Sequence, residues 1–294
     1  MPRRRKTPVG RRWIIALALV AVLGVTVWVT VRALGLRDVT VGAEAFRQPA
    51  EGFDVTWWNQ ALARWVRGDR VDYDSVLVEQ HGLRQFAATL GAFGPSVTPA
   101  RFPTEDVRLA YYINAYNALT LLAVVDNWPI ASVQDVHGWL EPRPGFGFFY
   151  GLRFLLDGDE TNLYDLENGV IRGFRDARIH AAINCASISC PPLAPRAYEA
   201  GTLDAQLDQA TRAFCGDSKH VRVDASAREI QLSSIFQWYR SDFEEHARRL
   251  GHPPTLDAFI EAFSTPEAAA ALVQARESGF EVVFLPYDWG LNRL

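Results

Sequence analysis

The sequence predicts a helix-rich α+β domain that follows one transmembrane helix. The first observation behind this prediction is an N-terminal run of basic residues, followed by an uncharged apolar stretch from Trp13 to Val31. The second is a change in the spacing of apolar residues along the chain. Apolar residues recur at helical spacing up to about residue 127, and short strand-like segments then alternate with helices. We therefore expect a single helical domain with a small mixed or antiparallel sheet.

Residues 1–12 form a basic leader and residues 13–31 a predicted signal anchor. Nineteen uncharged residues in a helix would be about as long as the bilayer core is thick. Few basic residues follow the apolar run, so the positive-inside bias puts the N-terminus in the cytoplasm and the remainder outside, in the periplasm or beyond the cell. A cleaved signal peptide is the alternative, because the triplet 43–45 has the A-x-A form, although it lies well downstream of Val31.

The composition limits the partners of the exported part. All 34 acidic residues and 24 of the 30 basic ones follow Val31, which gives this part a net charge of −10. That sign argues against nucleic acid and against anionic lipid surfaces as partners. The membrane, through residues 13–31, and a small-molecule or peptide-like substrate remain as expected partners. Nothing in the sequence indicates an oligomeric state.

The organisation after the anchor is simple. Residues 32–53 are a linker and residues 54–294 a globular domain, with no repeat or second linker. Apolar spacing predicts a helix that ends at Gly68-Asp69 and another over 75–93. A long helix is expected from the N-cap Thr104 to about Asn127 and should form the centre of the core, because it is apolar on nearly every side.

The second half mixes strands and helices. Strands are expected at 152–156, 178–184 and 280–285, with a turn at Asp157-Gly158 and a hairpin over 221–232. Helices are expected from a cap at Thr161 or Asn162 through Arg172, and then over 203–214, 234–249, 255–263 and 266–277.

Two amides stand out in the long helix. Asn114 and Asn117 lie about one turn apart on one face, among apolar neighbours. A buried amide without a partner costs about 1–3 kcal/mol. These side chains therefore either tie the helix to neighbouring backbone or line a pocket.

The segment from Arg178 to Leu193 holds the densest group of reactive side chains. If residues 178–184 form a strand, Arg178, His180 and Asn184 share one face, and Cys185 falls on the other unless the strand ends or bulges near Asn184. The catalytic hypothesis is a cysteine nucleophile paired with a histidine base. The alternatives are a Cys185–Cys190 disulfide, or a buried structural cysteine and histidine.

Other candidates are less specific. Glu167 and Arg172 precede the predicted strand and are expected to orient His180 or to bind a substrate carboxylate, or else to form a surface ion pair. The spacing of His180, Cys185 and Cys190 is not that of a zinc motif, so we expect neither a metal nor a cofactor.

Several motifs resemble the signatures of the domain-of-unknown-function family 547. They are Tyr111-Tyr-Ile-Asn-Ala-Tyr-Asn-Ala-Leu119, Arg178-Ile-His-Ala-Ala-Ile-Asn-Cys-Ala-Ser-Ile-Ser-Cys-Pro-Pro-Leu193 and Tyr287-Asp-Trp-Gly-Leu-Asn292, with support from 163–172 and 232–239. The resemblance covers about residues 55–294. It implies that the asparagine helix, the His-Cys segment and the C-terminal motif form one unit, and it supplies no reaction. Glu167-Asn168 departs from the Glu-His that the family often has there.

Three functions stay open on the sequence. The first is a thiol-dependent hydrolase or acyl transferase with Cys185 or Cys190 as nucleophile, His180 as base, and Glu167 or Asp288 orienting the imidazole. The second is a redox role for the two cysteines. The third is a structural ectodomain or a non-catalytic domain that binds a small ligand through polar side chains, namely Asn114, Asn117, Arg172, Arg178, His180 and Asn184. We also expect His180 and Asn184 to share one polar cluster with the two helix asparagines.

Overall fold

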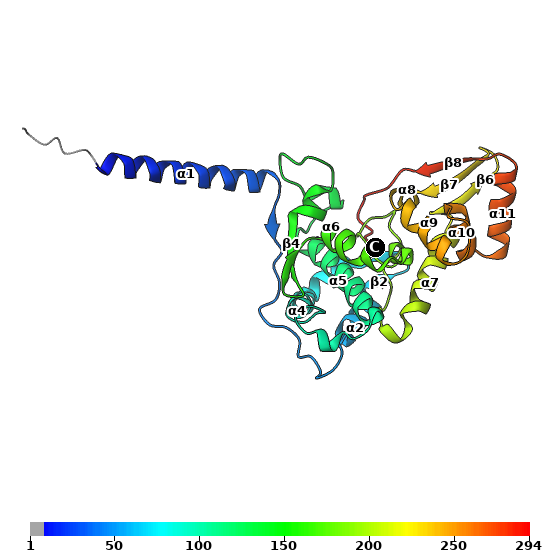
Figure 1. Ribbon diagram of the computed structural model, residues 1–294, viewed down its shortest axis with the longest axis horizontal. Helices are drawn as coiled ribbons and strands as arrows, with labels where there is room; N and C mark the ends of the chain where they lie inside the picture. The colour runs from blue at the N-terminus through cyan, green and yellow to red at the C-terminus, as the bar shows by residue number, and fades with distance from the viewer. Residues whose placement is uncertain (1–8) are drawn as a thin grey trace, which may run out of the picture.

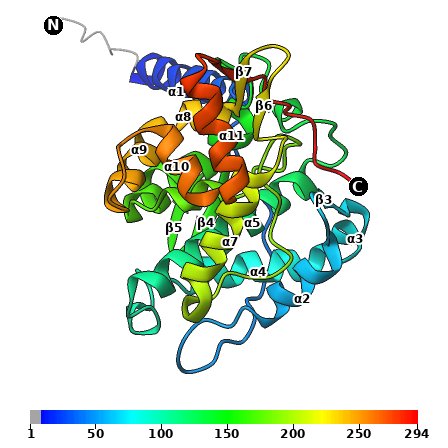
Figure 2. The same ribbon diagram turned by 90° about the vertical axis from the view of Figure 1, so that its right-hand side faces the viewer.

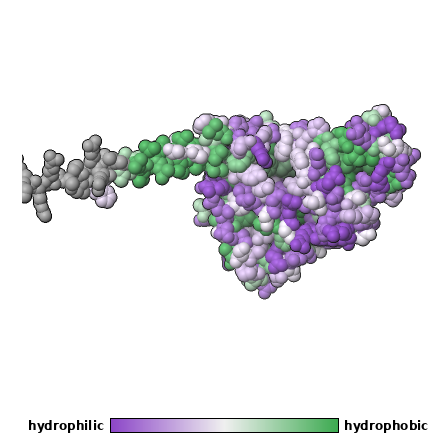
Figure 3. Space-filling model, turned by 45° about the horizontal axis from the view of Figure 1, so that its top comes forward, coloured by the Kyte–Doolittle hydropathy of each residue, from purple (hydrophilic) through white to green (hydrophobic). Residues whose placement is uncertain are grey.

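The structure is a computed structural model that describes residues 9–294. Helix α1 (Val9–Ala33) extends away from the body of the molecule as an isolated rod (Figure 1). Its described side chains from Ala16 to Thr30 are exposed, and apolar residues cover it in Figure 3. Among the side chains that the structure describes, which leave out those of residues 1–12, 14, 15 and 32, no helix is long and apolar enough to cross a membrane.

The body is a helix-rich α+β fold, as the sequence predicts. A first group of elements packs around α5 (Glu105–Asp126), whose residues from Leu109 to Val125 are buried except Tyr112. The predicted N-cap is confirmed, because Thr104 accepts a hydrogen bond from the amide of Val107. Around α5 lie α2 (Thr56–Trp65), α3 (Tyr73–Val78) and α4 (Gln80–Ala92).

Two small sheets belong to this first group. Strand β4 (Leu152–Leu156) has its predicted bounds and pairs in parallel with β1 (Arg37–Asp38) and antiparallel with β5 (Asp159–Thr161). The other sheet is the hairpin of β2 (Val66–Arg67) and β3 (Arg70–Val71). A buried cluster of apolar residues joins these elements into one core.

A second group of elements surrounds a mixed sheet on the side of the molecule opposite α1 (Figure 1). The predicted hairpin is confirmed as β6 (Val221–Asp224) and β7 (Glu229–Ser233), and the predicted last strand is β8 (Glu281–Leu285), parallel to β7. Helix α11 packs against this sheet and against α10 (Figure 2). The helices of this group are α7 (Leu203–Gly216), α8 (Ser234–Trp238), α9 (Arg240–Arg249), α10 (Leu256–Phe263) and α11 (Pro266–Glu277). They share a second apolar cluster.

The predicted strand at Arg178–Asn184 is wrong. These residues contribute to η6 (Ala177–Ala181), a short 3-10 helix whose first turn is capped by the Asp176 side chain, which accepts from the amide of Arg178. The helical turn continues to Ile183, whose amide donates to Ile179 O at 3.0 Å. A seven-residue stretch has no period long enough to distinguish the two structures, and the cap decides for the helix. The two-faced arrangement inferred for a strand therefore does not exist.

Three predicted helices are interrupted. The helix expected over 75–93 is divided at Glu79, and that over 234–249 at Tyr239. The helix expected through Arg172 begins after the predicted cap Asn162 as α6 (Leu163–Asp165) and continues as the π-helical turn η4 (Leu166–Val170) and the 3-10 turn η5 (Ile171–Phe174). The remaining short turns are η1 (Pro99–Arg101), η2 (Val133–Asp135), η3 (Gly147–Gly151) and η7 (Ala200–Thr202).

Candidate functional site

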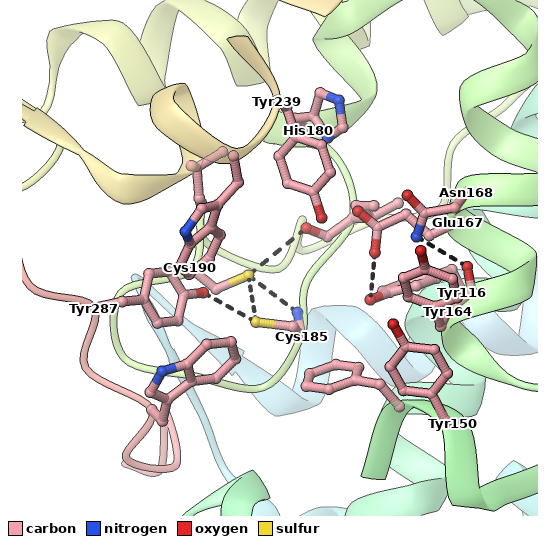
Figure 4. Close-up of a pocket in the computed structure, with 15 residues that line it drawn as sticks. Tyr116, Tyr150, Tyr164, Glu167, Asn168, His180, Cys185, Cys190, Tyr239 and Tyr287 are labelled. Carbon is pink, nitrogen blue, oxygen red and sulfur yellow. Dashed lines mark hydrogen bonds between the residues drawn. The ribbon is translucent and has the colours of Figure 1, made fainter. Parts of the chain in front are cut away.

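A cavity of about 170 Å³ lies between the two apolar clusters, and we call it the cysteine pocket. Eight of its fifteen lining residues are aromatic, and they come from α5, η3, α6, α8 and the C-terminal segment. The lining consists of Tyr116, Phe149, Tyr150, Tyr164, Glu167, Asn168, His180, Ile183, Cys185, Cys190, Ile235, Trp238, Tyr239, Tyr287 and Trp289 (Figure 4).

The two cysteines of the pocket face each other. Their Sγ atoms lie 3.1 Å apart, and the Cys185 amide donates to Cys190 Sγ at 3.0 Å. Both thiols are free, so the predicted alternative of a disulfide between them is not formed in this structure. Cys185 is partly exposed to the cavity, whereas Cys190 is buried.

A strained turn brings the two sulfur atoms together. Ala186 adopts φ +64°, a left-handed conformation that costs a residue with a Cβ about 1–2 kcal/mol. The Asn184 side chain holds this turn, because its Oδ1 accepts from the Ala186 amide at 2.9 Å. The chain then folds back, and the Cys190 amide donates to Ser187 O at 3.1 Å.

The C-terminal segment places a tyrosine hydroxyl beside the thiol pair. Ile188 donates its amide to Gly290 O at 2.8 Å, and this pairing holds the last residues against the cysteine turn. It places the Tyr287 hydroxyl 3.1 Å from Cys185 Sγ (Figure 4).

The two thiols have opposite pKa shifts. The hydrogen bond with Cys190 is the largest cause that lowers the pKa of Cys185 to about 7, against the effect of burial, and the Tyr287 hydroxyl acts in the same direction. Burial raises the pKa of Cys190 well above its usual value, and the hydrogen bond with Cys185 adds to this rise. Of the two thiols, Cys185 is therefore the one that ionises more readily, and Cys190 keeps its proton.

His180 lines the pocket but is not hydrogen-bonded to either cysteine. Its Nε2 atom lies 2.9 Å from Asp242 Oδ2, and its buried Nδ1 atom has no hydrogen-bond partner among the described residues. Its ring stacks on Tyr239, with the ring centroids 3.9 Å apart (Figure 4). Neither ring nitrogen is hydrogen-bonded to a sulfur, so the geometry expected for a Cys/His pair is absent here.

Glu167 occupies another wall of the pocket, on η4. Its side chain is buried, and its Oε2 atom accepts from the Tyr116 hydroxyl at 3.3 Å. It has no contact with His180 that would orient the imidazole as predicted. That position belongs to Asp242, which also receives two hydrogen bonds from Arg172, at 2.7 and 2.8 Å. Burial alone would raise the pKa of Asp242, but the hydrogen bond with His180 and then those with Arg172 hold it well below its usual range.

Two further predicted residues serve other parts of the fold. Arg178 is not in the pocket but pairs with Asp176, Asp204 and Asp208. Asp288 is exposed, and its Oδ1 atom accepts from the Gly290 amide at 2.8 Å, so it shapes the C-terminal turn and does not contact His180.

The predicted polar cluster forms only in part. Asn117 donates to Ala182 O at 3.0 Å and accepts from the Asn184 amide at 2.8 Å, as expected for helix amides that need partners. Asn114 instead bonds both backbone groups of Tyr198, at 2.8 and 3.0 Å. All three asparagines satisfy buried backbone, and none of them lines the pocket.

Sequence reasoning missed Tyr287, Asp242, Tyr239 and Tyr116 as parts of the site. Tyr116, Tyr239 and Tyr287 all lie in the motifs quoted above. Their spacing in the sequence does not predict which tyrosine hydroxyl lies near a cysteine sulfur. Asp242 is 62 residues from His180, and only the folded chain brings them together. No group of three His, Cys, Asp or Glu side chains that could hold a metal is found in the described part of the chain.

The fold and the pocket define a helix-rich α+β protein with a paired-thiol cavity. Residues 100–215 match the family described as "Protein of unknown function, DUF547". This match supports the resemblance inferred from the motifs, over a shorter stretch than expected. It contains the asparagine helix and the cysteine turn and ends before Tyr287. No curated protein and no solved structure matches the chain.

Proposed function

We propose that the protein is a thiol-dependent enzyme that performs thiol–disulfide exchange, with Cys185 as the attacking thiolate and Cys190 as the resolving thiol. The observation that carries this proposal is the placement of Cys185 Sγ at 3.1 Å from both Cys190 Sγ and the Tyr287 hydroxyl, at the wall of a cavity. A thiolate near neutral pH with a second thiol in contact is the arrangement that such exchange requires.

The exchange proceeds in two balanced steps. The Cys185 thiolate attacks one sulfur of an organic disulfide, forms a mixed disulfide and releases the other sulfur as a thiolate, which takes up a proton. Cys190 then loses its proton and attacks Cys185 Sγ, forming the Cys185–Cys190 disulfide and releasing the second half of the substrate as a thiol. The substrate is reduced by two electrons and the protein is oxidised by two; a low-molecular-weight thiol reverses the change.

The test uses the chromogenic disulfide 5,5′-dithiobis(2-nitrobenzoic acid). The wild-type pair should release two equivalents of thionitrobenzoate and retain no adduct, whereas Cys190→Ser should release one and keep one thionitrobenzoate on Cys185. Cys215→Ser is the matched control, because burial raises the pKa of this thiol and it lies outside the pocket. A stable adduct on the wild-type protein, or attack at Cys190 first, would disprove the resolving role.

Acyl transfer or amide and ester hydrolysis is the second candidate, as the residue types of the sequence suggest. The favourable observation is that Glu167, a buried carboxylate, lines the same cavity as Cys185. In this scheme Cys185 attacks a carbonyl carbon, and the leaving group departs with a proton. Incubation with an activated ester such as p-nitrophenyl acetate distinguishes the schemes. A thioester on Cys185 that water or an amine then cleaves supports acyl transfer, and the absence of turnover removes it.

We also propose that residues 13–31 anchor the protein in a membrane, with residues 1–12 in the cytoplasm and the body extracytoplasmic. Support comes from α1, whose described apolar side chains such as Leu17 and Leu23 are about two-thirds exposed, at 69% and 65%. At its C-terminal end, the exposed Trp139 and Leu140 lie beside Ala33, to whose carbonyl the Leu140 amide donates at 2.8 Å. A tryptophan at that level suits the membrane interface.

Protease added outside intact cells, or outside spheroplasts where an outer membrane exists, tests this anchor. The body should be digested while the leader stays protected, and the intact chain should pellet with membranes. Digestion of the leader alone would reverse the topology. A mature N-terminus just after residue 45 would show a cleaved signal peptide instead.

A further inference from the structure

The non-sulfur walls of the cysteine pocket are built mainly from aromatic rings. Trp238, Tyr287 and Trp289 form one mutually contacting group, with ring centroids 4.8 Å, 5.7 Å and 4.5 Å apart in its three pairs. Tyr150 and Tyr164 stack at 4.1 Å in another part of the lining. The face of an aromatic ring is electronegative and attracts cations, most strongly where water is excluded.

The described lining holds one carboxylate, and His180, its only imidazole, is paired with Asp242 outside the lining. Among the described lining residues, Glu167 is the only carboxylate, and none is Lys or Arg. Glu167 is 8% exposed and forms no ion pair within 4 Å with any described residue, although its charge is among the causes that raise the pKa of Arg172, after the hydrogen bond with Asp242. A buried carboxylate without a cation in direct contact is costly, and a cationic ligand in the pocket would supply that contact.

The charge of Glu167 affects the pKa values of two neighbouring tyrosines. Burial raises the pKa of Tyr116 well above its usual value, and the charge of Glu167 is the next cause. Burial followed by Glu167 also raises the pKa of Tyr239. Arg172, whose guanidinium lies over the Tyr239 ring at 5.3 Å, does not line the pocket and is already paired with Asp242.

We propose that the cysteine pocket binds an organic cation. An alkylated ammonium group of the ligand lies against the aromatic rings and is balanced by Glu167, while its thiol-reactive part lies at Cys185. This inference rests on the proposed function in one respect, because the ligand is taken to react with Cys185 Sγ.

Three methanethiosulfonate reagents test the charge preference directly: the cationic trimethylammonioethyl and the anionic sulfonatoethyl compounds, which are of similar size, and the neutral methyl compound, which is smaller. In each reaction the Cys185 thiolate forms a mixed disulfide, the S–SO₂ bond of the reagent breaks, and methanesulfinate leaves. Each rate is measured by peptide mass spectrometry in the Cys190→Ser variant, which keeps the adduct, and is divided by the rate of the same reagent with 2-mercaptoethanol. This division removes the intrinsic reactivity of the reagents.

The normalised rate of the cationic reagent should exceed that of the anionic one by about tenfold or more, as expected for one unit charge at close range in a site of intermediate dielectric. Glu167→Gln, added to Cys190→Ser, should remove most of this preference and Glu167→Asp should keep it. Glu277→Gln, at the exposed end of α11, makes the same charge change far from the pocket and should leave the preference intact. The glutamine variant also separates the effect of Glu167 from the attraction of the thiolate itself.

Equal normalised rates, or a preference that survives Glu167→Gln, would overturn the cation site. If the glutamine variant does not fold, the order of the three rates in the Glu167-containing protein decides. Failure of the neutral reagent to modify Cys185 is a different result, because it would contradict the reactive thiol of the proposed function and not the charge of the pocket.

Discussion

His180 Nε2 lies 2.9 Å from Asp242 Oδ2, and neither ring nitrogen of this histidine is hydrogen-bonded to a cysteine. Asp242 is shared with Arg172, which approaches it with two nitrogens. The carboxylate thus ties η5 and η6 to α9. In the proposed function His180 is therefore a positioning residue, and the lowered pKa of Cys185 comes mainly from its hydrogen bond with Cys190, with the Tyr287 hydroxyl acting in the same direction.

Asp242→Asn should therefore destabilise the protein without changing the thiol. We expect a loss of about 2 kcal/mol in the free energy of unfolding, because the hydrogen bonds of Arg172 and His180 to a charged carboxylate are weakened. The folded state holds the pKa of Asp242 well below its usual range, so this stabilisation is present above the unfolded pKa of about 4 and is lost as the pH falls below it. Urea unfolding at several pH values should show the two proteins converging in acid. A large fall in the alkylation rate of Cys185 would contradict the assignment.

Arg178→Ala should also act on stability alone. Arg178 has a side chain only 14% exposed and pairs with three aspartates, including Asp176 at 2.7 Å. We expect a loss of about 2–3 kcal/mol, less than for a fully buried pair, because two of the aspartates are partly open to solvent. Arg178 holds the pKa of Asp176 below its usual value, so this contribution too is lost in acid. Arg212→Ala is the control, since its contact with Asp208 is exposed and 3.9 Å long, and it should change stability by under about 0.5 kcal/mol.

Asn117→Ala should loosen the cysteine turn from the central helix. It leaves the Ala182 carbonyl and the Asn184 amide without partners in a buried region, and each costs about 1–3 kcal/mol. Calorimetry should show a clear fall in melting temperature. Asn127→Ala removes one bond to Ala123 O at the end of the same helix and should cost much less. Equal effects of the two changes would show that the asparagine bonds do not hold the turn.

The sequence predicted those parts of the fold where a single local signal dominates. Helix α5 has a cap at Thr104 and apolar residues on all sides, and β4 ends at a turn with Gly158 at φ +84°, so both were predicted with nearly correct bounds. The segment 178–184 was assigned wrongly, because seven residues carry no decisive period and the Asp176 cap decides the outcome. The contact of Cys185 with Tyr287 joins residues 102 positions apart, which no local pattern encodes.

The pH dependence of Cys185 alkylation tests the central claim most directly. Iodoacetamide labelling, quantified at each cysteine by peptide mass spectrometry, should give a rate for Cys185 that rises with pH to a midpoint near 7, while Cys190 stays almost unlabelled. Tyr287→Phe should move the midpoint upward, because the thiolate loses a hydrogen-bond donor. A midpoint for Cys185 at the ordinary thiol value of about 8.5, unchanged in Tyr287→Phe, would contradict the account.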